Sequence, residues 1–198
     1  MKKRFESEIR ISFDDMDEFL QKLEKFNAKV IYYYKFNDHM YYPNNPTSNW
    51  NPNIKTMRIR EHLLPDKVSR ILFSENTIIA GETFQFKQSK YPEGKIELYK
   101  GDQKTAEALL HAWDFKLHYK IEKKSGKLFE VIRPQKFVIA VEEIAQLGYS
   151  AEIELWGEDL ARIEKKFLDI ISLLEIPMDS VTWDSLPYIV AEKLGLFD

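Results

Sequence analysis

The feature that most constrains this chain is a set of strand-like segments in which charged residues recur two positions apart. The charged sets are Glu6/Glu8/Arg10, Arg58/Arg60, Lys95/Glu97 and Glu152/Glu154. Apolar residues occupy the alternate positions, as Ile9 and Ile11 do in the first segment, and this is the period of a strand with one buried face. Side chains two apart on a strand share a face and lie about 7 Å from each other. The sequence therefore predicts a sheet with one apolar face and one face crowded with charge.

Like charges at this spacing repel each other unless an opposite charge lies nearby. A metal cation relieves paired carboxylates, and a polyanion relieves paired arginines. A sheet that curls with its charged face inward would bring both clusters into one water-filled lumen. Arg and Lys bind phosphate oxygens, and Glu holds Mg²⁺ or Mn²⁺. One such pair alone is typical of a solvated strand face, but four on different strands favour a lumen that binds polyphosphate.

The other patterns predict an α+β chain. Period-2 alternation indicates strands at residues 5–11, 30–36, 40–42, 55–61, 68–73, 82–87, 95–99, 116–124, 127–133, 137–144 and 150–155. Amphipathic spacing indicates helices from an Asp14 or Asp15 cap to Phe26, and over 104–113, 159–175 and 183–194. Proline and asparagine make 43–53 a loop. No flexible linker divides the chain, so we expect a single domain over residues 1–198.

Several aromatic and histidine residues have a structural interpretation. The run Ile31-Tyr32-Tyr33-Tyr34 is expected to be a strand packed on both faces rather than a platform for base stacking. Trp50 is expected to pack on its own loop, the alternative being a place over the mouth of the lumen. The histidines have no metal-ligand spacing, although His118 shares a strand face with Lys120 and could reach the lumen.

Composition excludes other classes. The net charge of −3 lacks the basic excess of a non-specific nucleic-acid binder. There is no cysteine, which removes disulfides and thiolate chemistry and suits a reducing cytoplasm. No run of about 18 apolar residues occurs, so we expect no membrane span, and the N-terminus does not read as a signal peptide.

Motifs in the same order along the chain resemble those of the CYTH superfamily, which unites class IV adenylate cyclases, thiamine triphosphatases and inorganic triphosphatases. Glu6-Ser7-Glu8-Ile9-Arg10 is similar to its ExExK signature. The other matching segments are Tyr41-Tyr42, Met57-Arg58-Ile59-Arg60, Phe84-Gln85-Phe86-Lys87, Lys95-Ile96-Glu97, Val141-Glu142-Glu143-Ile144, Leu147-Gly148, Glu152-Ile153-Glu154 and Leu186-Pro187-Tyr188-Ile189. The resemblance spans nearly the whole chain.

The resemblance implies an antiparallel, eight-stranded, barrel-like triphosphate tunnel with helices packed outside. It implies a protein that binds a triphosphate-containing small molecule with Mg²⁺ or Mn²⁺ and hydrolyses it, as a monomer or a homodimer. The implied metal ligands are Glu6, Glu8, Glu97, Glu142, Glu152 and Glu154. The implied substrate-binding residues are Arg58, Arg60, Lys87, Lys95, Lys123 and Tyr41, and the implied catalytic residues are Glu8, Arg10 and Glu154.

The chain departs from the family pattern at several positions. Arg10 replaces the signature lysine, and a guanidinium is a poor general base. Lys95 replaces an arginine, and Glu142 replaces an aspartate. Ser125 stands where an arginine is usual, unless Lys127 or Arg133 takes its place.

The aspartate that precedes the paired tyrosines is displaced: either His39 occupies its position, or Asp38 does after a one-residue bulge. These departures leave two alternatives beside hydrolysis. One is a class IV adenylate cyclase that makes cyclic AMP, and the other is a non-catalytic protein that binds polyphosphate or nucleotide.

Overall fold

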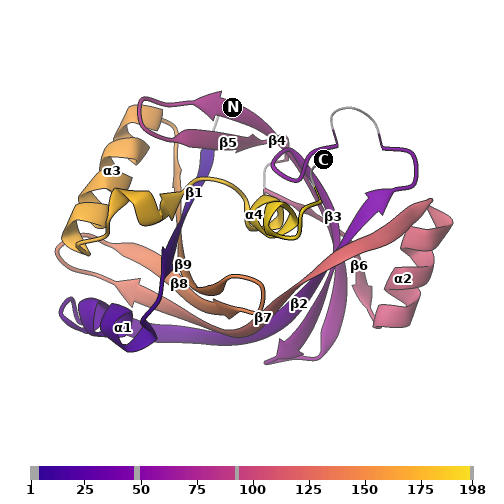
Figure 1. Cartoon of the computed structure of the whole chain (residues 1–198), viewed down its shortest axis with the longest axis horizontal. Helices are drawn as coiled ribbons and strands as arrows, with labels where there is room; N and C mark the ends of the chain where they lie inside the picture. The colour runs from indigo at the N-terminus through magenta and orange to yellow at the C-terminus, as the bar shows by residue number, and fades with distance from the viewer. Residues whose placement is uncertain (1–4, 47–49, 92–93, 197–198) are drawn as a thin grey trace.

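In the computed structural model, which describes residues 5–46, 50–91 and 94–196, an antiparallel sheet curls round on itself (Figure 1). The strands of the sheet are β1 Phe5–Phe13, β2 Lys29–Pro43, β3 Lys55–Leu64, β4 Val68–Ala80, β5 Gln85–Ser89, β6 Ile96–Gly101, β7 Phe115–Val131, β8 Phe137–Ile144, β9 Gly148–Gly157 and β10 Val181–Thr182. The α+β, barrel-like arrangement that the sequence predicted is thus confirmed.

Eight of these strands form the ring. The order runs β1-β5-β4-β3-β2-β7-β8-β9, and β9 pairs with β1 again. The β1–β9 pairing extends along the whole of β1, whereas the described residues of β1 and β5 share one residue pair, Glu6 with Lys87. The two further strands are additions to the ring, since β6 pairs with β4 and β10 pairs with β1.

Three helices lie outside the ring and one lies on its inner face (Figure 1). The outer helices are α1 Met16–Glu24, α2 Gln103–Ala112 and α3 Leu160–Leu173. Asp15, rather than Asp14, caps α1 and accepts hydrogen bonds from two backbone N–H groups. The fourth helix, α4 Leu186–Lys193, packs its Leu186 and Val190 against Met40 and Ile121, and it departs in this respect from the expectation that all helices are external.

Two long strands replace pairs of shorter ones in the prediction. β2 runs through residues 30–36 and 40–42 without a break, and β7 joins 116–124 to the second predicted strand, 127–133, but ends at Val131. Their mutual register shifts by bulges, between Tyr34 and Phe36 and between Met40 and Tyr41. The extra residue at each of these shifts lies in β7, and the lumen-facing side chains of β2 alternate regularly as Tyr32, Tyr34, Phe36 and Asp38. A bulge changes which side chains face inward, and in β7 both Lys123 and Leu128 line the lumen although they are five positions apart.

The aromatic run at the start of β2 is not packed on both faces, which corrects the prediction. Tyr32 is 44% exposed and Tyr33 is 60% exposed. Trp50 packs against aromatic rings of the sheet rather than on its own loop, with its ring centroid 5.5 Å from that of Phe115 in β7. His118 lies against Tyr42.

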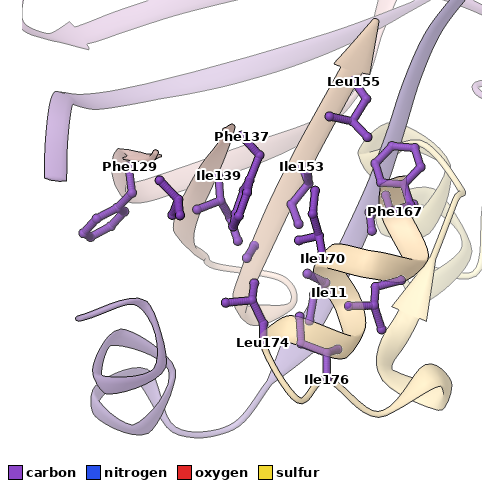
Figure 2. Packing of buried hydrophobic residues seen from close by; sticks show 14 of the residues in the cluster. Ile11, Phe129, Phe137, Ile139, Ile153, Leu155, Phe167, Ile170, Leu174 and Ile176 are labelled. Carbon is purple, nitrogen blue, oxygen red and sulfur yellow. The ribbon is translucent and has the colours of Figure 1, made fainter. Parts of the chain in front are cut away.

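The main hydrophobic core lies between the outer face of the ring and the helices (Figure 2). Ile11, Ile139 and Ile153 from β1, β8 and β9 meet Phe167 and Ile170 of α3, and all five are at most 1% exposed. A smaller cluster holds α2 over β3 and β4. Because the core is outside the ring, the inner face is free to carry polar groups.

One buried carboxylate ties α3 to the turn between β4 and β5. Glu164 is 6% exposed and accepts hydrogen bonds from the backbone N–H groups of Glu82, Thr83 and Phe84. These bonds fix the segment that leads into β5. Among the described residues, none of the helices has the length and apolar character needed to cross a bilayer.

Candidate functional site

The inner face of the ring lines a cavity of about 480 Å³. Its basic lining residues are Arg58, Arg60, Lys87, Lys95 and Lys123, and its acidic lining residues are Glu8, Asp38, Glu142, Glu152 and Glu154. The first turn of α4 contributes Leu186 and Pro187 to the wall. Five formal positive charges therefore face five formal negative charges in one enclosure.

Most of the residues singled out from the sequence come together here. The cavity is lined by predicted residues of both kinds: Glu8, Arg58, Arg60, Lys87, Lys95, Lys123, Glu142, Glu152 and Glu154. Arg10 lies just behind them, 5% exposed, and contacts Glu142 and Glu152.

Three predicted residues are placed differently. Tyr41 is buried beneath α2, beside Met57 and Leu110. Glu97 is on the added strand β6, where it pairs with Arg70. It lines a second cavity of about 340 Å³ together with Arg60, His62, Arg70, Leu72 and Lys95. The side chain of Glu6 lies outside the described residues.

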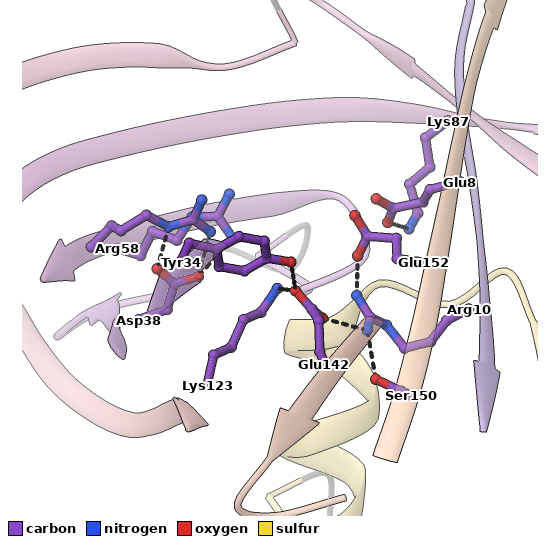
Figure 3. Close-up of polar contacts among 11 residues, drawn as sticks. Glu8, Arg10, Tyr34, Asp38, Arg58, Lys87, Lys123, Glu142, Ser150 and Glu152 are labelled. Carbon is purple, nitrogen blue, oxygen red and sulfur yellow. Dashed lines mark hydrogen bonds and ion pairs between the residues drawn. The ribbon is translucent and has the colours of Figure 1, made fainter. Parts of the chain in front are cut away.

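A buried network surrounds Glu142 (Figure 3). Arg10 donates a hydrogen bond to Glu142 Oε2 at 3.0 Å, while Lys123 and the hydroxyl of Tyr34 both donate to Oε1. Burial alone would raise the pKa of Glu142, but the cations of Lys123 and Arg10 hold it at about 2. Burial and the charge of Glu142 raise the pKa of Tyr34, so its hydroxyl stays protonated and can donate. Glu142 is therefore an anion at neutral pH with its charge already compensated.

Asp38 occupies the inward position that the sequence left open between two residues. It is 1% exposed, and both of its carboxylate oxygens accept from Arg60 at 2.7 Å. His39 points to the other face of β2, where it contacts Glu61. Burial opposes ionisation of Asp38, but Arg60 and Arg58 hold the pKa of its carboxyl well below the usual range.

Arg58 is a lumen cation whose hydrogen-bonding capacity is only partly used. Its contact with Asp38 is long, at 3.5 Å. Its Nε is buried and finds no hydrogen-bond acceptor within the described part of the chain. A buried donor without a partner is rare in proteins and often marks a ligand position.

The opposite wall brings carboxylates together. Glu8 and Glu154 are direct partners in the β1–β9 register, and both line the cavity. Lys87 donates to Glu8 at 2.9 Å, and this lysine, with Arg10 and Arg58, lowers the pKa of Glu8 against the effect of burial. Glu154 accepts from the indole N–H of Trp156, and burial together with the charges of Glu152 and Glu8 raises its pKa. Like charges directly opposite each other destabilise a strand pair, so this wall gains from a cation.

A divalent cation fits the chemistry of these donors. Mg²⁺ in phosphate-binding sites is usually held by one or two carboxylates together with phosphate oxygens. Glu8 and Glu154 offer such a pair, with Glu152 beside them. Within the residues that the structure describes, no three His, Asp or Glu side chains are already grouped to hold a metal ion. The protein alone supplies part of a coordination sphere, and a phosphate ligand would supply the rest.

Some lumen residues were missed from the sequence. Tyr34 and Phe36 line the cavity, and the guanidinium of Arg60 lies 3.8 Å from the centre of the Phe36 ring. Opposite Tyr34 stands Gly126, where an added Cβ would lie 2.2 Å from the ring. The bulge between Lys123 and Ser125 turns Gly126 inward and leaves Ser125 exposed.

The ring of Tyr34 therefore fills the space near the position where the family pattern has an arginine. Lys127 and Arg133 do not line this cavity in the described structure. The one signal available in the sequence was the small Gly126 in an otherwise bulky strand.

No family model and no curated protein sequence matches the chain. Several solved structures share its fold. A conserved hypothetical protein from Pyrococcus furiosus has a TM-score of 0.68 at 19% identity, covering 92% of this chain and 98% of its own. A candidate adenylate cyclase from Vibrio parahaemolyticus has a TM-score of 0.69 at 16% identity, with 96% and 98% coverage.

A third structure comes from Hippeastrum, a candidate adenylyl cyclase described as having a dominant triphosphatase activity. Its TM-score is 0.60 at 10% identity, with 97% and 96% coverage. At these identities the likeness concerns the fold, and it agrees with the fold that the resemblance to the CYTH superfamily implied.

Proposed function

We propose that this protein binds a triphosphate compound together with a divalent cation in the lumen and hydrolyses it. The observation that carries the proposal is the convergence of five basic side chains on one cavity whose opposite wall holds facing glutamates. Clustered Arg and Lys side chains bind phosphate oxygens through charge-assisted hydrogen bonds. The unsatisfied Nε of Arg58 is the donor most in need of an anion.

The balance of charge supports a requirement for metal. The described residues that line the lumen include five acids and five bases, so together they have no formal net charge with which to attract a polyanion. In a complex of triphosphate with Mg²⁺ or Mn²⁺, the metal ion neutralises part of the negative charge of the triphosphate. Glu8 and Glu154 would hold the ion, with Glu152 as a further donor. When bound, the ion would neutralise charge that develops on phosphoryl oxygens and lower the pKa of bound water.

The side chains of the lumen would do the positioning. Arg58, Arg60, Lys87 and Lys123 would hold the phosphate groups from three sides of the ring, and Lys95 would reach them from the segment before β6. Charge-assisted donors fixed before the substrate arrives stabilise a phosphoryl-transfer transition state. Arg10 is held by Glu142, Glu152 and Ser150. We therefore assign it to positioning these carboxylates rather than to proton transfer.

Two related proteins support different reactions in this fold. The Hippeastrum protein is described as a triphosphatase, which favours hydrolysis. The Vibrio protein is a candidate adenylate cyclase, which keeps cyclisation of ATP as the second candidate function. Both reactions would use the same phosphate-binding and metal-binding side chains. They differ in the nucleophile and in the bond that breaks: water releases a terminal phosphate in hydrolysis, whereas the ribose 3′-hydroxyl of ATP attacks the α-phosphorus in cyclisation and pyrophosphate leaves.

A product analysis tests the proposal. Inorganic triphosphate, thiamine triphosphate and ATP are each incubated with the protein and Mg²⁺ or Mn²⁺, and all products are resolved. We expect phosphate release that requires the metal and is lost in Glu154→Gln. The matched control is Glu143→Gln, since Glu143 lies on the outer side of β8 and contacts Lys124; it should retain activity.

The outcomes separate the candidates. Formation of cyclic AMP and pyrophosphate from ATP would identify the reaction as cyclisation instead of hydrolysis. Thermal stabilisation by triphosphate without any product would leave a binding protein. Absence of both binding and turnover with all three compounds would overturn the proposal.

A further inference from the structure

Three aromatic rings form a stack along the inner face of β2. The ring centroids of Tyr34 and Phe36 are 5.5 Å apart with an interplanar angle of 18°, and those of Tyr32 and Tyr34 are 6.1 Å apart with an angle of 25°. Tyr32, Tyr34 and Phe36 all line the lumen. Near-parallel rings at this spacing are favourable aromatic contacts. The stack therefore forms a continuous aromatic surface beside the charged groups.

The inner end of this stack meets the phosphate-binding groups. Arg60 covers the ring of Phe36 at 3.8 Å, and the ammonium of Lys123 lies 4.8 Å from the same ring centre. Phe36 itself is 5% exposed. If the phosphates of a ligand contact Arg60 and Lys123, the adjoining part of that ligand lies beside Phe36, the innermost ring of the stack.

The outer end is open. Within the described residues, Tyr32 stacks on Tyr34 alone, and it is 44% exposed. The wall beside it is apolar, because Leu128 of β7 and Ala140 of β8 follow Tyr32 across the sheet. Exposed aromatic side chains next to a basic track are the usual means by which proteins hold planar bases.

Two features fix the middle ring in place. The hydroxyl of Tyr34 donates to Glu142, and Gly126 leaves room for its ring, since any Cβ there would collide with it. Tyr32 therefore rests on a ring that cannot turn away. A pre-organised surface of this kind loses little entropy when a ligand binds.

We propose that the outer face of Tyr32 binds a planar heteroaromatic ring carried by the triphosphate, so that the preferred ligand is an organic triphosphate rather than inorganic triphosphate. The proposal rests on the proposed function for its phosphate end. The heteroaromatic ring could belong to a nucleoside triphosphate or to thiamine triphosphate. These two share the chemistry but differ in the reach between ring and phosphate.

Calorimetric titration tests it with three probes: inorganic triphosphate, ATP and thiamine triphosphate, each with Ca²⁺ in place of Mg²⁺ to slow turnover. Stacking of one ring on one aromatic side chain is worth about 1–3 kcal/mol. We therefore expect Tyr32→Ala to lower the affinity for ATP or thiamine triphosphate about tenfold and to leave the affinity for inorganic triphosphate unchanged. Tyr32→Trp should restore the affinity of whichever organic ligand is lost.

Tyr33→Ala is the matched control, since Tyr33 is the next residue and is 60% exposed without lining the lumen; it should leave all three affinities unchanged. Equal loss for inorganic and organic triphosphates in Tyr32→Ala, or no loss for any of them, would overturn the ring site and leave the proposed function standing. If the unaltered protein binds none of the three, the proposed function fails, and the ring site fails with it.

Discussion

The two faces of β1 and β9 differ more sharply than any other two regions of the molecule. On the outer face, Ile9 and Ile153 are at most 1% exposed and pack under the helices. On the inner face of the same strands, Glu8, Arg10 and Glu154 are grouped round a polar cavity. Adjacent residues of one strand therefore have different roles: one packs in the core, and the next lines the cavity.

The difference teaches where stability and binding come from. Burial of apolar surface is the dominant favourable contribution to folding, and here it is concentrated outside the ring. Buried ion pairs add little net stability, because desolvation offsets the attraction between the charges. Apolar packing outside the ring therefore carries the fold, and a change on the inner face costs stability mainly where it leaves a buried charge without its partner.

The largest expected effect tests the outer face. Phe167 is fully buried in α3, and Phe167→Ala should lower the free energy of unfolding by about 3–5 kcal/mol because it leaves a cavity. Chemical denaturation measures this change. Leu168→Ala, at the adjacent exposed position, should change the same quantity far less. The folded fraction of Phe167→Ala should still bind triphosphate, and a loss of that affinity would break the division between the two faces.

Next in size is a change on the inner face. Glu142→Gln removes the anion that Arg10 and Lys123 share, and breaking a buried pair from one side costs about 3 kcal/mol or more. Glu143→Gln, on the opposite side of β8, should cost much less. If the two variants unfold at the same denaturant concentration, the inner network does not contribute to stability as we infer.

Acid should reduce the contribution of Glu142 on the inner face to the free energy of unfolding. The pKa of Glu142 is lowered to about 2 from 4.5, so the unfolded state binds more protons than the folded state between these values. The stability that Glu142 supplies is then fully present above about pH 4.5 and is lost as the pH falls toward 2. Denaturation at a series of pH values should show this fall, on the order of 2–3 kcal/mol. The fall should be shallower in Glu142→Gln, and an identical pH profile for the two proteins would contradict the assignment.

The smallest effect on stability should come with a clear effect on binding. Arg58→Ala removes a cation whose contact with Asp38 is long, while Arg60 still compensates that carboxylate. We expect little change in unfolding free energy but a loss of at least about tenfold in triphosphate affinity, since hydrogen bonds to charged groups are worth about 1.5–3 kcal/mol. Lys124→Ala, on the outside of β7, should leave the affinity unchanged. Unaltered affinity in Arg58→Ala would remove Arg58 from the site.

Alternation in the sequence was enough to assign faces where strands are regular. Arg58 with Arg60, and Glu152 with Glu154, share the inner face as their spacing indicates. Alternation failed where a strand bulges, because a bulge depends on the partner strand and leaves no mark in the strand's own residues. This happens in β7, where Lys123 and Leu128 both line the lumen although they are five positions apart. In β2 the lumen-facing residues Phe36 and Asp38 do alternate, and Tyr41 falls on the outer face under α2, but alternation alone does not say which of the two faces turns inward.

Long-range partners account for the other differences. Ser125-Gly126 looked like a break between two strands, but Tyr34 packs over Gly126 and keeps β7 continuous. Glu97 is grouped with Lys95 in the charge pattern, yet in the described structure β6 pairs with β4 outside the ring, and Glu97 lines the second cavity. The exposed position of Tyr32 likewise follows from β2 extending past the end of β3, which no local pattern reveals.

Among the described residues, β1 and β5 share one residue pair, the shortest of the described pairings that close the ring. Local unfolding starts where few hydrogen bonds hold the backbone, so amide protons of β5 should exchange with solvent faster than those of β9. Lys87 on β5 and Glu8 on β1 both face the lumen and contact each other across this pairing. A ligand held by both strands would then act as a cross-link, and its binding would be recorded as slower exchange in β5.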